Sequence, residues 1–354
     1  MIDDFGWSPA LQHSFAPFAQ QGLSPARVIA QHRDLWTLAT PLGETRARVS
    51  GRFAHTAPEG GYPVVGDWLA TDITGLVIEA VLPRRSLFQR RAPGGDGVQA
   101  ICANLDLLIV AMSLNADLNP RRLERYLAAG RESGAQTLVV LTKADLAPVE
   151  DAVAALAPSL AGAALIAVSA LTGEGFEGLW AHLPAGRTAA LVGSSGVGKS
   201  TLLNRLLGTD AMDTGAIRED DDRGRHTTRH RELFRLPNGA LLIDTPGLRE
   251  LGLAGDPAAL DDSFADVTGL MTACRFSDCG HTSEPGCAVR AALEAGALSP
   301  ARLAAYHKLQ RELAFDRRRH DAGAQAAERA KWKAIHTQQA ARDRFRRKNT
   351  AYED

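Results

Sequence analysis

One stretch of the sequence has the residue types and spacing of a phosphate-binding loop. Residues 193–200 read Gly-Ser-Ser-Gly-Val-Gly-Lys-Ser, which matches the pattern G-x-x-x-x-G-K-[ST]. The glycines let successive backbone N–H groups point at one phosphate group, while Lys199 can reach the β- and γ-phosphates and Ser200 can bind Mg²⁺. The loop follows the apolar run 188–192 and precedes the helix formers 201–207. Strand, loop and helix in this order provide the context that a chance glycine turn would lack.

Two further segments can recognise a guanine base. Thr142-Lys143-Ala144-Asp145 follows the apolar run 137–141, and a carboxylate there can accept hydrogen bonds from guanine N1–H and the 2-amino group. Adenine offers neither donor at those positions, so Asp145 would select guanine. The small-residue turn Ser169–Gly173 follows the next predicted strand, and its backbone could contact guanine O6.

Two later segments can complete a nucleotide site. Asp244-Thr245-Pro246-Gly247 follows a predicted strand; Asp244 can hold Mg²⁺ through water, and the Gly247 amide can contact the γ-phosphate. The polar loop 223–228 offers hydroxyl groups to Mg²⁺. The guanine segments precede the phosphate loop and these two follow it, so the chain resembles the circularly permuted GTPases, with the usual five motifs in a rotated order.

A second metal site is indicated near the C-terminus by Cys274, Cys279, His281 and Cys287, spaced C-x₄-C-x-H-x₅-C. Three thiolates and one imidazole make a closed tetrahedral zinc site of the structural kind. Redox chemistry or chance clustering is the alternative for these residues. Cys102 stands apart and is expected to be a core thiol.

The rest of the chain indicates how these residues are positioned. Short β-type runs separated by turn residues predict an OB-like β-barrel; they are 26–29, 35–38, 46–49, 64–68 and 76–81. Alternating strands and helices then predict a doubly wound α/β domain; its expected elements are strands 105–110, 137–141, 165–168, 188–192, 230–236 and 240–243 and helices 119–133, 149–156, 176–182 and 201–207. We expect four regions: an N-terminal arm (1–25), an OB-like barrel (26–95), a circularly permuted P-loop GTPase domain (96–255) and a helical zinc-binding domain with a basic tail (256–354).

This layout resembles the ribosome small-subunit-dependent GTPase family of bacteria from about residue 26 to about residue 332. Further matching stretches are 63–68, 244–250 and 306–310. The resemblance implies GTP hydrolysis coupled to late maturation of the small ribosomal subunit, stimulated by that subunit and driving release. It also implies 16S rRNA as a partner, GTP with Mg²⁺, one structural Zn²⁺, a cytoplasmic location and a monomer.

The resemblance and the motifs together assign roles to individual residues. Lys199 and His226 are the candidate catalytic residues, although His226 could instead contact RNA or pack within its loop. The candidate nucleotide-binding residues are Thr142, Lys143, Asp145, Ser169, Ala170, Gly193, Ser194, Ser195, Gly196, Val197, Gly198, Lys199, Ser200, Thr201, Thr227, Thr228, Asp244 and Gly247. The candidate Mg²⁺ ligands are Ser200, Thr228 and Asp244. Whether Thr227 or Thr228 takes this role is open, because the family's switch loop usually has three threonines after its histidine, and Arg229 stands here in place of the third. Two other departures are Thr142, where GTPases more often have Asn, and Leu248, where many carry a water-orienting Gln.

Charge and composition favour a protein that binds a polyanion and argue against a membrane-spanning or disulfide-rich protein. Residues 301–354 carry 14 Lys and Arg against 7 Asp and Glu, although the 354-residue chain has a net charge of −1. Such a basic segment favours a polyanionic partner such as RNA, with a solvated helix face as the alternative. No apolar stretch approaches a membrane span, no signal peptide is evident, and the 4 cysteines do not suggest a disulfide scaffold. A GTP-regulated RNA-binding module, or a permuted GTPase acting on another RNA assembly such as the large subunit, remains the alternative function.

Overall fold

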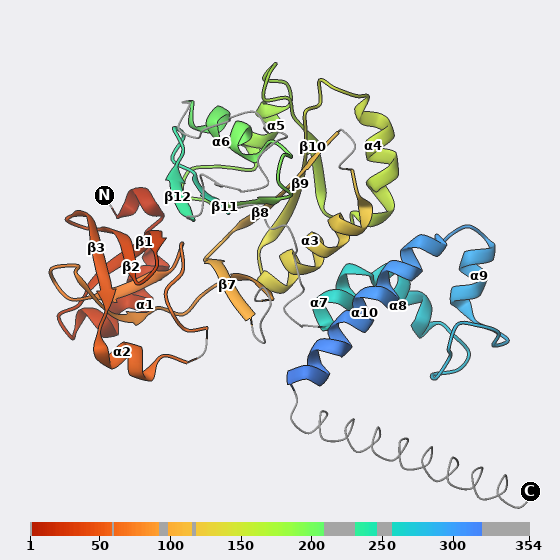
Figure 1. Ribbon diagram of the computed structural model, residues 1–354, viewed down its shortest axis with the longest axis horizontal. Coiled ribbons are helices and arrows are strands. Elements are labelled where there is room, and N and C mark those ends of the chain that lie inside the picture. Colours follow the sequence, from red (N-terminus) through yellow and green to blue (C-terminus); the bar gives the residue numbers. More distant parts are fainter. Residues whose placement is uncertain are drawn as a thin grey trace, which may run out of the picture.

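The computed structural model describes residues 2–58, 60–91, 98–114, 118–208, 231–245 and 257–320. Figure 1 shows a small β-barrel, a central α/β domain and a set of C-terminal helices arranged in a row. This arrangement confirms the expected multidomain architecture. Among the described residues, no helix combines the length and the apolar character that crossing a membrane requires.

The barrel is a closed five-stranded sheet in the order β1-β2-β3-β5-β4, with β4 pairing back to β1. Its elements are β1 (Ser24–His32), β2 (Leu35–Thr40), β3 (Gly43–Val49), α2 (Gly51–Thr56), β4 (Trp68–Thr71) and β5 (Val77–Val81). The fourth predicted strand, 64–68, was wrong except for its last residue. Residues 64–67 form a turn instead, because the Asp67 carboxylate accepts a hydrogen bond from Val64 N at 2.8 Å.

This turn fastens the barrel to the segment that follows it. Arg84 donates to both carboxylate oxygens of Asp67, from Nε at 2.9 Å and from Nη2 at 2.8 Å. Gly66 has φ +93°, and a Cβ at that position would lie 2.2 Å from the carbonyl oxygen of Ala103. Arg84 is therefore an internal partner of Asp67.

The N-terminal residues form η1 (Asp3–Phe5) and α1 (Pro9–Ala19), which pack on the barrel. Helix α1 begins where it does because Ser8 caps it, accepting a hydrogen bond from Leu11 N at 3.3 Å, and Pro9 occupies the first turn. The ring of Trp7 meets Phe15 and Trp68 edge-on.

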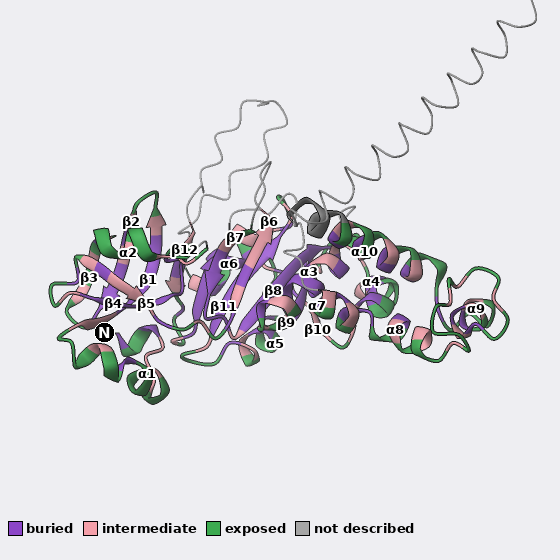
Figure 2. Ribbon diagram, turned by 90° about the horizontal axis from the view of Figure 1, so that it is seen from below, coloured by how far each residue is buried: buried purple, intermediate pink, exposed green. Residues whose placement is uncertain are grey.

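The central domain is a six-stranded sheet in the order β10-β9-β8-β11-β13-β12. Its strands are β8 (Leu107–Ser113), β9 (Gln136–Thr142), β10 (Ala164–Ala167), β11 (Thr188–Gly193), β12 (Glu232–Arg235) and β13 (Leu241–Asp244). Only β12 runs antiparallel to its neighbour β13. The buried middle strands are visible in Figure 2.

Helices cover both faces of this sheet, as its apolar strands require. They are α3 (Pro120–Ser133), α4 (Val149–Leu156), η2 (Ala157–Ser159), α5 (Phe176–Ala181) and α6 (Lys199–Leu207). Along β8, Leu108 and Val110 belong to the apolar cluster that includes α3 and α4, whereas Leu107 and Ile109 belong to the cluster that includes α5 and α6. The predicted doubly wound arrangement is confirmed.

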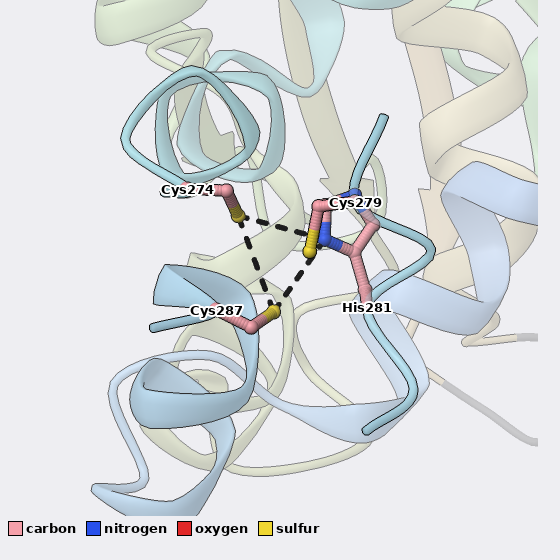
Figure 3. A group of neighbouring side chains, drawn as sticks. All are labelled: Cys274, Cys279, His281 and Cys287. Carbon is pink, nitrogen blue, oxygen red and sulfur yellow. Dashed lines mark hydrogen bonds between the residues drawn. The ribbon is translucent and has the colours of Figure 1, made fainter. Parts of the chain in front are cut away.

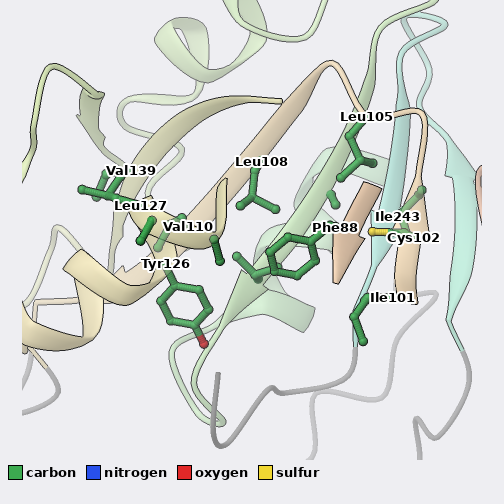
Figure 4. Packing of buried hydrophobic residues seen from close by; sticks show 14 of the residues in the cluster. Phe88, Ile101, Cys102, Leu105, Leu108, Val110, Tyr126, Leu127, Val139 and Ile243 are labelled. Atoms are coloured by element: carbon green, nitrogen blue, oxygen red, sulfur yellow. The ribbon is translucent and has the colours of Figure 1, made fainter. Parts of the chain in front are cut away.

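A hairpin that sequence reasoning missed connects the barrel to this domain. Its strands β6 (Leu87–Arg91) and β7 (Val98–Ala103) are antiparallel. Phe88, Ile101 and Cys102 are fully buried and belong to the same apolar cluster as Leu108 and Val110, part of which Figure 4 shows. The expected boundary after residue 95 falls in the connection between these strands, outside the described residues.

The barrel and the central domain share one continuous eleven-stranded sheet, because β1 pairs with β12 at Ala30 and Glu232. The buried Arg27 side chain strengthens this junction. It donates to Thr188 Oγ1 at 2.9 Å and to the carbonyl oxygens of Gly66 and Phe5. Burial lowers its pKa to about 9, which leaves the guanidinium charged at neutral pH.

The C-terminal helices are α7 (Pro257–Ser263), α8 (Ala265–Thr272), α9 (Ala288–Glu294) and α10 (Pro300–His320). Their apolar faces join the same core as α3. Two ion pairs connect them to α3: Arg302 with Glu124 at 3.0 Å, and Arg125 with Glu312 at 2.6 Å. The described C-terminal helices are therefore attached to the central domain at α3.

Candidate functional site

The phosphate loop lies where β11 ends and α6 begins. Gly196 and Gly198 have φ +81° and +95°, a backbone conformation that L side chains rarely adopt. Gly193, at φ +151°, lies so close to β8 that a Cβ would be 2.5 Å from the carbonyl oxygen of Ala111. Helix α6 begins at Lys199, two residues before the expected start, so Lys199, Ser200 and Thr201 form its first turn. The N-terminus of this helix, which carries partial positive charge, faces the loop.

Lys199 folds back over the loop. Its ammonium donates to the carbonyl oxygens of Gly193 at 2.9 Å and Ser194 at 2.6 Å. Ser195 and Gly196 are exposed at the crest of the loop, whereas Val197 is buried beneath it. The loop thus offers a flexible cation, backbone amides and a helix N-terminus at one point, which is what a phosphate chain requires.

Asp244 lies beside this loop at the end of β13, where it is in register with Leu191 of the parallel strand β11. Burial raises the pKa of Asp244, while the nearby Lys199 charge acts in the opposite direction. The next residue, Thr245, donates its hydroxyl to the Leu191 carbonyl at 2.7 Å. A buried carboxylate and the Ser200 hydroxyl are oxygen ligands of the type that Mg²⁺ prefers.

Thr142 and Lys143 hold the loop from the side of β9. The Thr142 hydroxyl bonds to the Val197 carbonyl and faces that of Met112 at 3.2 Å. Lys143, with φ +59°, extends across the loop and donates to the Gly196 carbonyl at 3.1 Å. Thr142 therefore provides a contact to the loop at the position where GTPases more often have Asn.

Asp145 and Ser169 meet at the ends of β9 and β10. The Ser169 hydroxyl donates to Asp145 Oδ1 at 2.5 Å, which fixes the orientation of the carboxylate. The Ser169 turn is itself closed by the Gly173 amide, which donates to the Ser169 carbonyl at 2.8 Å. Ala170 follows in this turn, half-buried. The arrangement presents a carboxylate and a turn of small residues side by side.

Arg122 also reaches the phosphate loop, and sequence reasoning missed it. It lies in the first turn of α3, and its Nη1 donates to the Ser194 hydroxyl at 2.6 Å. The available signal was its position just after a helix start, Asn119-Pro120, at the carboxyl edge of the sheet. His226, Thr227, Thr228 and Gly247 lie outside the described residues.

The four predicted zinc ligands converge beyond α8, as Figure 3 shows; they are Cys274, Cys279, His281 and Cys287. Their ligand atoms all lie within 4.8 Å of one another. Cys274 Sγ and Cys287 Sγ are 4.0 Å apart, and each is 3.6 Å from His281 Nδ1. The sulfur–sulfur edge of a tetrahedral zinc site with Zn–S bonds of 2.3 Å is about 3.8 Å. The four residues therefore fit a zinc ion.

The loop that carries these ligands is shaped by local hydrogen bonds. The Glu284 carboxylate accepts hydrogen bonds from the backbone N–H groups of Gly280, Thr282 and Ser283. Backbone hydrogen bonds, including one from its own N–H, lower the pKa of Glu284 to about 2. Cys287 caps α9, with its sulfur 3.4 Å from Arg290 N.

The comparisons with known proteins agree with this arrangement. The RsgA GTPase family profile matches residues 81–254. "Small ribosomal subunit biogenesis GTPase RsgA" of Opitutus terrae is 46% identical over 97% of this chain and 98% of its own length. The protein of the same name from Syntrophotalea carbinolica is 43% identical over 94% of this chain and 95% of its own length.

Two solved structures share the fold. YjeQ from Thermotoga maritima superposes with a TM-score of 0.60 at 27% identity, covering 82% of this chain and 98% of that one. YloQ, described as a circularly permuted GTPase, superposes with a TM-score of 0.58 at 22% identity, covering 82% of this chain and 95% of that one. With its barrel, its permuted motif order and relatives of this similarity along nearly its whole length, the chain belongs to the RsgA GTPase family.

Proposed function

We propose that this GTPase acts on the small ribosomal subunit, assists its late maturation and leaves it upon GTP hydrolysis. The subunit stimulates the reaction. The observation that carries the proposal is the convergence of Lys199, Thr142, Lys143 and Asp244 on one phosphate loop in a chain whose relatives are named for biogenesis of that subunit.

Each residue then has a role in hydrolysis. Asp145, oriented by Ser169, accepts hydrogen bonds from guanine N1–H and the 2-amino group, and the Ala170 turn meets O6. The ammonium of Lys199 leaves the loop carbonyls for the β- and γ-phosphates, where it stabilises the developing charge. Ser200 and Asp244 would hold Mg²⁺, with Thr227 or Thr228 as a further ligand, and the ion would supply further neutralisation of the phosphates. Leu248 cannot orient water, so we assign that task to His226.

The zinc cluster has a structural role, and the barrel and the basic C-terminal segment bind RNA. One structural zinc ion would be held by Cys274, Cys279, His281 and Cys287. These four ligands leave no open position on the metal, so it takes no part in the reaction. The barrel and the basic C-terminal segment contact 16S rRNA through phosphates. The protein acts as a monomer in the cytoplasm.

The deciding experiment is GTP hydrolysis by the full chain, titrated with purified small and large subunits. We expect slow turnover alone and strong stimulation by small subunits only. Equal stimulation by large subunits would favour another RNA assembly as the target, and indifference to both would favour a GTP-regulated binding module. His226→Ala should retain nucleotide and subunit binding but lose most of the stimulated rate.

The base assignment has its own test. Asp145→Asn exchanges an acceptor for a donor, so nucleotide preference should shift from guanine to xanthine. Competition by ATP as effective as that by GTP in the unaltered protein would contradict the role given to Asp145.

A further inference from the structure

Two cationic side chains from different helices meet on one residue of the phosphate loop. The Arg122 guanidinium donates to the Ser194 hydroxyl at 2.6 Å, and the Lys199 ammonium donates to the Ser194 carbonyl, also at 2.6 Å. Ser194 is thus held at its side chain by α3 and at its backbone by the lysine that serves the phosphates.

The fold places Arg122 at this point. Ala111 of β8 and Gly193 of β11 are in register in parallel strands, so the segments that leave these strands emerge at the same edge of the sheet. Helix α3 has a defined start there, because the Asn119 side chain accepts a hydrogen bond from Arg122 N at 3.2 Å and Pro120 occupies the first turn. The arginine is half-buried and extends from this rigid start.

We propose that Arg122 is a positioning residue for GTP hydrolysis, acting through Ser194. By fixing Ser194, it fixes the part of the loop from which the amides and Lys199 meet the phosphates. A charge-assisted hydrogen bond of 2.6 Å is a strong one. Without it, the loop would lose conformational entropy when it becomes ordered in the transition state, and this loss would raise the activation free energy. This inference rests on the proposed hydrolysis at this loop.

The kinetic consequence is a loss in kcat larger than the change in KM. Ground-state binding tolerates a loosened loop, because the amides and Lys199 can still reach the phosphates. The transition state demands accurate placement, and a small misplacement is felt mainly there. For the loss of one charge-assisted hydrogen bond we expect kcat to fall about tenfold.

The test is single-turnover and steady-state hydrolysis of GTP with Mg²⁺ by the full chain, together with GDP affinity and thermal unfolding. Arg122→Ala should lower kcat about tenfold with GDP affinity and unfolding temperature nearly unchanged. Arg122→Lys, which keeps a charged donor, should recover part of the loss. Arg121→Ala removes the exposed neighbouring arginine and is the matched control, expected to behave as the unaltered protein.

The mechanism predicts coupling between the two partners. Ser194→Ala should reproduce the loss, and the double variant should be no slower than either single variant, because both remove the same hydrogen bond. An unchanged kcat in Arg122→Ala, or fully additive losses in the double variant, would overturn the inference. Hydrolysis by the unaltered chain and by Arg121→Ala separates these outcomes from a failure of the proposed function, in which neither protein would turn over GTP.

Discussion

The attachment of the C-terminal helices to α3 should depend on one buried arginine. Arg302 and Glu124 each expose 4% of their side chains and pair at 3.0 Å. The same guanidinium donates twice to Asp266, at 2.9 and 3.0 Å, and once to the Ser263 carbonyl at 2.8 Å. It also lies 4.0 Å above the ring of Phe264. We consider the replacement Arg302→Met, which keeps the apolar length and removes the charge.

The expected loss in the free energy of unfolding differs between replacing Arg302 and replacing Glu124. In Arg302→Met, the Glu124 carboxylate stays buried with Ser159 Oγ as a donor at 3.0 Å to one oxygen, and its other oxygen has no partner among the described residues. An uncompensated buried charge costs about 3–5 kcal/mol. In Glu124→Gln, Arg302 retains Asp266 and the amide oxygen can still accept a hydrogen bond, so we expect a loss of about 1–2 kcal/mol.

Urea unfolding of the full chain, with hydrogen exchange resolved for α3 and α10, measures both effects. Arg290→Met provides the control, because its ion pair with Glu294 is exposed and such pairs contribute about 0.3–0.5 kcal/mol. The double variant Arg302→Met with Glu124→Leu should regain most of the stability, since it buries no charge. The reasoning is refuted if Arg302→Met costs no more than Glu124→Gln or the exposed control.

Three further changes test other parts of the molecule. Gly66→Ala should lower the unfolding temperature far more than Gly162→Ala, because a Cβ at Gly66 would meet Ala103 O at 2.2 Å, whereas Gly162 has positive φ but no described atom within 4 Å; equal shifts would contradict this. Cys279→Ser should lose the one zinc ion expected per chain by elemental analysis, and metal retained at the full amount would count against the cluster. Burial raises the pKa of Asp244, so lowering the pH should protonate it and weaken Mg²⁺-dependent GTP binding at a higher pH than an exposed aspartate would; Asp244→Asn should abolish that pH dependence.

Local chemistry made much of the fold predictable from the sequence. Asn119-Pro120 predicts the start of α3, and Asn119 caps that helix in the structure. The apolar run 188–192 predicts β11, which extends one residue further, to Gly193. Such signals depend on neighbouring residues alone, so a sequence shows them directly.

The errors and omissions concern residues whose partners are distant. The run 64–68 has the composition of a strand, but Asp67 turns the chain there by bonding to Val64 and Arg84. Arg122 contacts Ser194 across 72 residues, and no periodicity indicates such a partner. The charge, polarity and helix position of Arg122 are visible in the sequence, but the atom that it meets depends on strand order.

The pairing of β1 with β12 also determines how the molecule meets other chains. A strand at the border of a sheet presents unpaired N–H and C=O groups and can recruit a strand from another molecule. Here β1 of the barrel pairs with that border of the GTPase sheet at one residue pair, Ala30 and Glu232, and the barrel itself is closed by β4 on β1. Within the described residues, the exposed border that remains on the main sheet is β10 (Ala164–Ala167), only 4 residues long. Because β1 occupies this position, another chain has less room to add a strand beside β12 than beside an open border.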